Sequence, residues 1–353
     1  MALKVGSYSI ADLLANKQTT VAEVDEQELA AVLQRELDAH NALTDDMVTP
    51  LADLTEDRQR AAGAGENGEN VELDEFGRAP TQKTDVGANL GFPLKKFGDA
   101  VGWTRDYFEM ATLSDFARKA QGIMLRDTRR ILTEAKKALY LSSNYSITDR
   151  YVAPALSLDV KRLANADSFA IPAGPNGEAF DSSTHSHYTA ENGMTAAGVL
   201  ASVNNVLEHF DNAQTITVIN SADEAGVRGL TGFKEFVEPG VQLGTGQVAT
   251  QRLDSTNLNN RAIGRFGGSI VWVKPWGIDN YLLTYVTSGG QKPLAYRVPT
   301  GNRKGLRLMA HIAVHPLHAD QFQRMFGFGV QNRVAAAVHY IGGGSYTDPT
   351  ISL

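Results

Sequence analysis

Cysteine is absent from this sequence of 353 residues. Its absence excludes a disulfide framework, thiolate catalysis and zinc or iron–sulfur sites with cysteine ligands, and it is typical of proteins made in a reducing cytoplasm. Long apolar runs are also absent, since none reaches the roughly 20 residues that a membrane-spanning helix needs. The first residues lack the charged and apolar segments of a secretory signal. We therefore expect no role in a membrane and no export.

Basic residues are in the minority. The chain has 33 Lys and Arg against 40 Asp and Glu, which gives a formal net charge of −7. A free-standing nucleic-acid binder normally shows a basic stripe or a high isoelectric point, so any contact with DNA must be local. The hydrophobic content of 42% is that of a folded protein, and the length suffices for two sizeable cores.

The common catalytic motifs are missing as well. The sequence contains no G-x-x-x-x-G-K-[ST] phosphate loop, no G-x-S-x-G elbow and no H-E-x-x-H zinc helix. Residues 244–249, GTGQVA, match the spacing of a dinucleotide fingerprint, but polar residues follow at once and Asp254 lies too near to take the acidic position. We interpret this phrase as a glycine-rich surface loop, and we predict no catalytic or cofactor-binding residue.

His185 and His187 form the one pattern that suits a metal ion. Two histidines separated by one residue point to the same face of a strand, where both imidazoles can act as ligands. The sequence does not specify a third ligand, although Glu208 and His209 are available. A metal-dependent enzyme that uses this pair is therefore a lesser alternative, and our main expectation includes no metal and no enzymatic activity.

Hydrophobic periodicity predicts three helices and several strands. An acidic amphipathic helix over residues 20–41 either packs on its own domain or forms an arm that reaches a neighbour. The longest helix, residues 114–141, begins at Ser114 as its cap, and a third helix covers residues 195–210. The expected strands are residues 215–220, 269–273, 281–287, 311–314 and 334–341. Such scattered strands with few long helices indicate an α+β fold.

Residues 60–96 have no sustained apolar period and begin with a glycine-rich polar run. A segment of this length without a period is rare inside a compact domain, unless it is a functional extension or disordered. We therefore predict an extended loop or hairpin that projects from the body.

The longest predicted helix carries two rows of basic residues, because separations of seven and eleven residues return close to the same angle on a helix. One row consists of Arg118, Arg129 and Lys136, and the next consists of Lys119, Arg126, Arg130 and Lys137. The rows form either a solvated face or a surface that faces a packaged polyanion.

Two phrases carry a resemblance to a known family. The first is GFGVQNR, which begins at Gly327 and leads into an apolar strand that ends at Ile341; the second is THSHY at residues 184–188. Both resemble phrases of tailed-bacteriophage major capsid proteins, which have the Hong Kong 97 fold. The order of the predicted elements is similar to that of this family.

The resemblance implies five regions along the chain. They are an N-terminal arm (residues 1–58), an extended E-loop region (59–108), a P domain with a long spine helix (109–190), an A domain (191–325) and a return strand to the P domain (326–353).

The resemblance also implies a structural function. Chains of this family assemble with copies of themselves, as hexamers and pentamers, into an icosahedral shell that encloses double-stranded DNA, with scaffold, portal and cement proteins as further partners. The chain would then belong to a virion capsid assembled in the host cytoplasm, and the seven basic residues of the long helix would face the DNA. Some relatives crosslink a loop lysine to an asparagine of a neighbouring subunit, parts that Lys83 and Asn332 could take. An encapsulin-like compartment around cargo protein is the main alternative.

Overall fold

The computed structural model describes residues 9–352, except 25, 63–70, 74, 80–87, 168, 170, 237–259, 289 and 315–316. The glycine-rich phrase at 244–249, Lys83 and residues 63–70, 74 and 80–87 of the predicted extension lie outside the described residues. Within the described part, no helix is long and apolar enough to cross a membrane.

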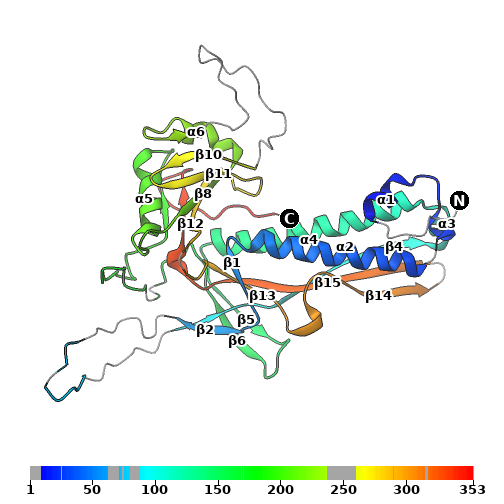
Figure 1. Cartoon of the computed structure of the whole chain (residues 1–353), viewed down its shortest axis with the longest axis horizontal. Coiled ribbons are helices and arrows are strands. Elements are labelled where there is room, and N and C mark those ends of the chain that lie inside the picture. Colours follow the sequence, from blue (N-terminus) through cyan, green and yellow to red (C-terminus); the bar gives the residue numbers. More distant parts are fainter. Residues whose placement is uncertain are drawn as a thin grey trace, which may run out of the picture.

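One part of the molecule is a five-stranded sheet built around one long strand, β15 (Leu317–Val330). β15 pairs with β4 and β14 over its first part and with β13 over its last residues, and β1 adds to β13 in parallel. Two long helices, α2 and α4, run side by side along this sheet (Figure 1). The elements around β15 are β1 (Ala52–Thr55), β4 (Lys95–Thr104), β13 (Leu294–Arg297), β14 (Arg307–Val314), α2 (Glu26–Val48) and α4 (Leu113–Tyr140).

The helix α4 confirms the longest predicted helix, with a different cap. Thr112 accepts a hydrogen bond from the main-chain N–H of Asp115, and the Asp115 carboxylate bonds back to the main chain of Thr112. This reciprocal capping box satisfies two N–H groups that a helix start leaves open. The prediction of Ser114 as the cap is wrong: Ser114 lies inside the first turn and is buried.

The helix α2 begins and ends later than predicted. A short 3-10 turn, η1 (Val21–Glu23), precedes it, and the helix runs on to Val48. His40, Thr44 and Val48 are all buried at four-residue spacing, so polar residues continue the buried face and hide its period in the sequence. Val32 and Leu37 share a core with Ala117 and Ile123 of α4, which shows that this helix packs on its own chain.

The other part of the molecule is a seven-stranded sheet with the strand order β7-β16-β12-β8-β11-β10-β9. The helix α5 (Ala196–Leu207) packs on it, and Thr195 caps α5. The predicted strands at residues 215–220, 269–273, 281–287 and 334–341 correspond to members of this sheet. Its strands are β7 (Tyr188–Ala190), β8 (Thr215–Ile219), β9 (Lys234–Glu235), β10 (Arg261–Phe266), β11 (Ser269–Val273), β12 (Tyr281–Val286) and β16 (Ala336–Tyr340).

The GFGV phrase, whose two glycines in the sequence suggest a turn, is the end of strand β15. Gly327 and Gly329 occupy alternate strand positions. A Cβ at Gly327 would lie 2.1 Å from the Pro93 carbonyl oxygen, and a Cβ at Gly329 would lie 2.8 Å from the Gly91 carbonyl oxygen. Glycine therefore lets the chain around residues 91–93 cross close to the strand. The turn comes afterwards, at η4 (Arg333–Ala335), and β16 joins the seven-stranded sheet instead of returning to the sheet beside α4.

Smaller elements complete the fold. β2 (Gln59–Ala62) and β3 (Ala88–Gly91) form a separate antiparallel pair at the base of the predicted extension, and β4 belongs to the sheet of β15. β5 (Tyr145–Asp149) and β6 (Leu156–Val160) form another pair. The remaining short helices are α1 (Ile10–Ala15), α3 (Arg105–Met110), α6 (Glu224–Arg228), η2 (Ser221–Asp223) and η3 (Gly301–Arg303).

A buried ion pair holds the base of the extension to the body. Arg297 on β13 donates to the Asp149 carboxylate at 2.7 Å and to the Phe92 carbonyl at 2.9 Å. Arg58, next to β2, donates to the same carboxylate oxygen at 3.0 Å. The Arg297 and Asp149 side chains are 1% and 0% exposed, so each charge depends on its partner.

Replacement of Asp149 by Asn should lower the free energy of unfolding by about 3–5 kcal/mol, because it leaves the guanidinium of Arg297 buried without a counter-charge. Chemical denaturation of the purified chain measures this change. Asp159→Asn, at an exposed position of the adjoining strand β6, serves as the control and should stay within about 0.5 kcal/mol. A decrease below about 1 kcal/mol in Asp149→Asn would contradict this role.

Candidate functional site on the long helix

The rotation of α4 about its own axis is fixed by Asp127. This carboxylate lies 3.1 Å from Nε of Arg324 on β15 and 2.8 Å from Nε2 of His40 on α2. The Arg324 guanidinium also donates to Thr44 and to the hydroxyl of Tyr296. All of these groups are buried. The face of α4 that carries Asp127 therefore points into the sheet and toward α2.

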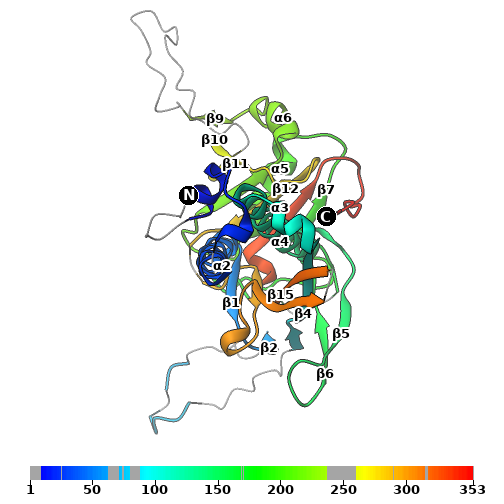
Figure 2. The same ribbon diagram turned by 90° about the vertical axis from the view of Figure 1, so that its right-hand side faces the viewer.

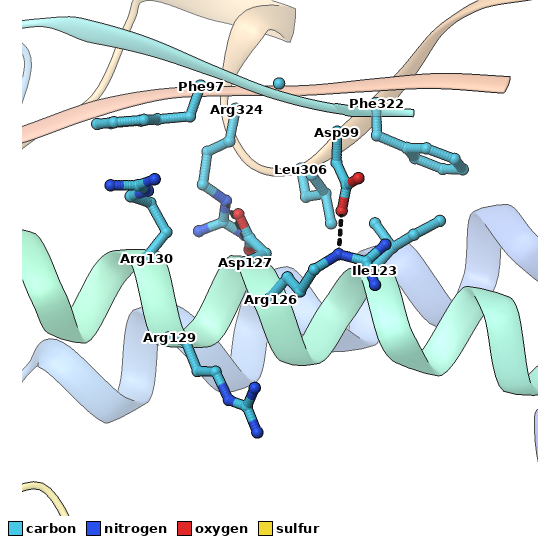
Figure 3. Close-up of a pocket in the computed structure, with 11 residues that line it drawn as sticks. Phe97, Asp99, Ile123, Arg126, Asp127, Arg129, Arg130, Leu306, Phe322 and Arg324 are labelled. Atoms are coloured by element: carbon cyan, nitrogen blue, oxygen red, sulfur yellow. Dashed lines mark hydrogen bonds and ion pairs between the residues drawn. The ribbon is translucent and has the colours of Figure 1, made fainter. Parts of the chain in front are cut away.

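One of the two basic rows of α4 packs on β4 and α3. Arg126 donates to the Asp99 carboxylate at 2.6 Å, and the Arg130 guanidinium lies over the Phe97 ring, as Figure 3 shows. The Lys119 ammonium lies 4.1 Å from the centre of the Tyr107 ring and 5.1 Å from that of Trp103. These contacts combine ion pairing with cation–π attraction. The side chains of this row thus have partners within the chain, which their spacing in the sequence does not reveal.

Lys137, the last member of this row, pairs with Glu134. The Glu134 carboxylate is buried, and it accepts hydrogen bonds from Lys95 at 2.9 Å and from Lys137 at 3.0 Å. Burial alone would raise the pKa of Glu134, but the hydrogen bonds and charges of these two lysines outweigh it and lower the pKa below its usual value. Glu134 thus stays ionised and joins the helix to the start of β4.

The other basic row points away from the sheet. Nine residues make two and a half turns of a helix, so Arg118 and Lys136, nine residues before and after Asp127, lie on the face opposite to it. Arg129 lies in the same row as these two residues. Arg118 and Arg129 are exposed, and Figure 3 shows Arg129 directed away from the strands. Lys136 is half-buried, and burial lowers its pKa. These three residues are called the outer row below.

The neighbouring helix α2 carries the opposite charge on its exposed face. Asp38, Asp45 and Asp46 are exposed there, together with Arg35. The side of the molecule that the two helices form thus shows an acidic ridge beside a basic one. A polyanion that binds this side meets the outer row of α4 beside the acidic ridge of α2.

A cavity of about 320 Å³ lies between α4 and β4. Two ion pairs lie in its wall, Arg126 with Asp99 and Arg324 with Asp127, and Arg129 and Arg130 line it as well. The lining residues are Phe97, Gly98, Asp99, Ile123, Arg126, Asp127, Arg129, Arg130, Leu306, Phe322 and Arg324.

Exposed apolar side chains gather at the end of the molecule where α3 and the tips of β14 and β15 meet. Met110 of α3, Val314 of β14 and Leu317 of β15 are exposed. Leu317 pairs with Thr104, the residue before α3, so the three elements adjoin. Contiguous exposed apolar residues are typical of an interaction surface. Sequence reasoning missed this surface, because only the fold brings the segments together.

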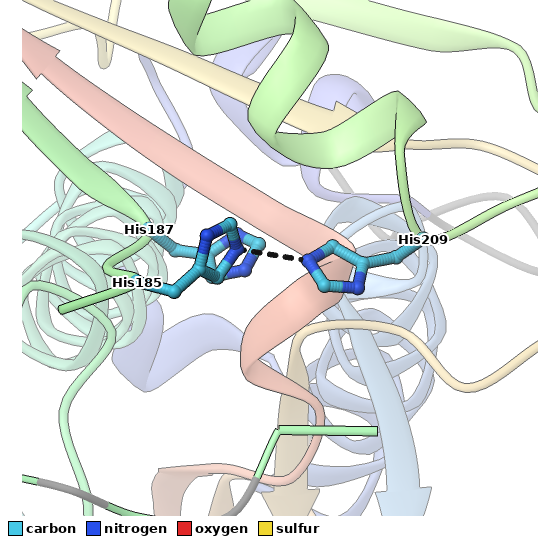
Figure 4. A group of neighbouring side chains, drawn as sticks. All are labelled: His185, His187 and His209. Atoms are coloured by element: carbon cyan, nitrogen blue, oxygen red, sulfur yellow. Dashed lines mark hydrogen bonds between the residues drawn. The ribbon is translucent and has the colours of Figure 1, made fainter. Parts of the chain in front are cut away.

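The histidine pair acquires a third member. His209 follows α5 and lies against His185 and His187, so the three imidazoles converge (Figure 4). Lys83 and Asn332 are the candidates for a crosslink between subunits. Asn332 donates to the carbonyl of Gln291, and Lys83 lies outside the described residues.

No family model matches the chain, and its sequence matches no curated protein. Among solved structures, a chain of Mycobacterium phage Patience superposes with a TM-score of 0.67 at 18% identity, over 99% of this chain and 96% of that one. The capsid of a native GTA particle gives a TM-score of 0.48 at 11% identity over 85% and 91% of the two chains. The holo-SrpI encapsulin complex from Synechococcus elongatus PCC 7942 gives 0.44 at 12% identity over 99% and 100%.

The similarity to the Mycobacterium phage structure extends over nearly the full length of both chains. It shows that this chain has the α+β Hong Kong 97-type capsid fold that the sequence phrases predicted.

Proposed function

We propose that this chain is the major capsid protein of a tailed bacteriophage, a structural subunit without catalytic activity. Copies of it assemble as hexamers and pentamers into an icosahedral shell around double-stranded DNA, in the host cytoplasm. The observation that carries the proposal is the likeness over 99% of the chain to a structure from a Mycobacterium phage. Scaffold, portal and cement proteins are the further partners that such a shell implies.

The distribution of exposed apolar residues supports assembly through several surfaces. One group, with Met110, Val314 and Leu317, lies at the α3 end, and another, with Leu73 and Phe76, lies in the described part of the extension. Figure 1 places these groups toward opposite ends of the molecule. Many modest contacts repeated around a closed shell stabilise it collectively, without one large interface.

The outer row of α4 supports an inner surface that meets DNA. Arg118 and Arg129 are exposed on a helix whose other basic residues are used within the chain. Phosphate contacts of this kind give affinity without reading sequence. The acidic ridge of α2 limits them to a few per subunit, and the number of subunits multiplies their effect.

An encapsulin-like compartment is the second candidate, because it would use the same shell-forming fold. It would enclose cargo protein in place of a genome. A shell interior without affinity for DNA would favour it, and the outer row is the feature that makes the two candidates differ.

Removal of the extension should prevent shell formation without unfolding the body. We would join β2 to β3 by replacing residues 63–87 with Asn-Gly, a turn suited to a two-residue hairpin. The core clusters contain no residue of the replaced segment among those that the structure describes, so the melting temperature should change little. Electron microscopy should show no shells.

A glycine and serine segment of the original length is the matched control, since it keeps the reach of the extension and removes its side chains. It should also fail to form shells. Normal shells from the shortened chain would contradict an assembly role of the extension, and loss of cooperative unfolding would place it in the core.

The two basic rows should differ in their contribution to DNA binding. Arg118→Gln, Arg129→Gln and Lys136→Gln together should weaken binding of a short double-stranded DNA, because they remove the outward charges. The slope of log affinity against log salt should become shallower by about 0.9 for each phosphate that the variant no longer neutralises. Fluorescence anisotropy of labelled DNA over a salt series measures both quantities.

The control triple, Lys119→Gln, Arg126→Gln and Arg130→Gln, removes the same charge from the row that packs on β4 and α3. It should retain most of the DNA affinity and the salt slope. Equal weakening in both triples would show that only net charge matters, and an unchanged affinity in the outer-row triple would rule out this row as the DNA-binding surface.

A further inference from the structure

Three histidines from two separate segments meet beside the seven-stranded sheet. His185 and His187 directly precede β7, and the His187 carbonyl accepts a hydrogen bond from the N–H of Val338 on β16 at 2.9 Å. His209 lies just beyond the end of α5, whose last residues pack over the same sheet. The sheet thus places the first two rings, and the helix places the third.

The separations between the rings suit a single metal ion. Nε2 of His185 and Nε2 of His209 are 3.1 Å apart, and one ligand atom from each of the three rings lies within 4.8 Å of the others. Two nitrogens bound to one tetrahedral zinc at 2.0–2.1 Å are about 3.3 Å apart. The His185 and His209 nitrogens are already close to that spacing.

The His187 ring needs a partner. It is 0% exposed, and neither of its ring nitrogens has a hydrogen bond of normal geometry to any described residue. Buried polar atoms in this state are costly. A bound metal ion would give one of these two nitrogens its missing partner.

Glu208 lies beside two of the three histidines and offers a fourth ligand atom. Its Oε1 lies 3.4 Å from Nε2 of His185 and 4.0 Å from Nε2 of His209, again close to the spacing of ligands around one ion. The Phe180 ring packs on His185 and His209, with ring centres 4.7 and 4.2 Å away. An apolar wall of this kind limits the access of water to the site.

We propose that His185, His187, His209 and Glu208 form a structural site for a divalent cation of the zinc class. Four protein ligands leave no open position, which distinguishes this site from a catalytic one. The bound ion ties the loop before β7 to the end of α5. Cation binding therefore stabilises the seven-stranded half of the subunit, independently of what the shell encloses.

Cobalt absorption tests the proposal on the purified full-length chain after treatment with a chelator. Addition of Co²⁺ alone should produce the visible absorption of a tetrahedral site, at one ion per chain, and Zn²⁺ should abolish it by displacement. Saturating Zn²⁺ should also raise the melting temperature by about 5 °C at a hundredfold excess over Kd.

His185→Gln and His209→Gln each remove one ligand and should weaken Co²⁺ binding by at least about 100-fold. The His185 side chain is 18% exposed and that of His209 is 2% exposed, so circular dichroism first checks that each variant folds, and His185→Gln is the variant with the smaller change in packing. His311→Gln, an exposed histidine on β14, is the control and should leave binding unchanged. Absence of the tetrahedral spectrum in the unmodified chain, or equal binding in all three variants, would overturn the proposal.

Discussion

The buried ion pair between Asp127 and Arg324 determines which face of α4 meets the sheet and which meets the surroundings. Arg324 lies on β15, the strand that joins β4, β13 and β14, so the pair fixes the longest helix to the centre of the first sheet. Because His40 also binds Asp127, the same carboxylate holds α2 beside α4. The outer row of basic residues faces outward because it lies opposite both this ion pair and the buried apolar stripe of α4.

Periodicity predicted the existence of α4 and the two basic rows on it, because both follow from spacing along one helix. It could not tell which row is exposed, since that depends on Arg324, far away in the sequence. The strand β15 escaped prediction because Gly327 and Gly329 resemble turn residues until the crossing chain at Pro93 is seen. The third histidine, His209, could be named as a candidate from the sequence, but only the fold brings it to His185.

The exposed apolar residues and the exposed charged rows lie on separate parts of the chain. Apolar residues at the α3 end and in the extension suit contacts with other copies, while the helix side combines a basic ridge with an acidic one. The overall charge of −7 is compatible with the proposed capsid, since the proposed contact with DNA would be confined to this narrow row.

Electron microscopy of the purified full-length chain, alone and with a scaffold protein, tests the central claim most directly. A subunit of this fold, with exposed apolar surfaces toward both ends, should appear as rings of subunits or as closed shells far larger than one chain. Light scattering should give a matching particle mass. A monodisperse monomer at high concentration, with the scaffold present, would contradict the account.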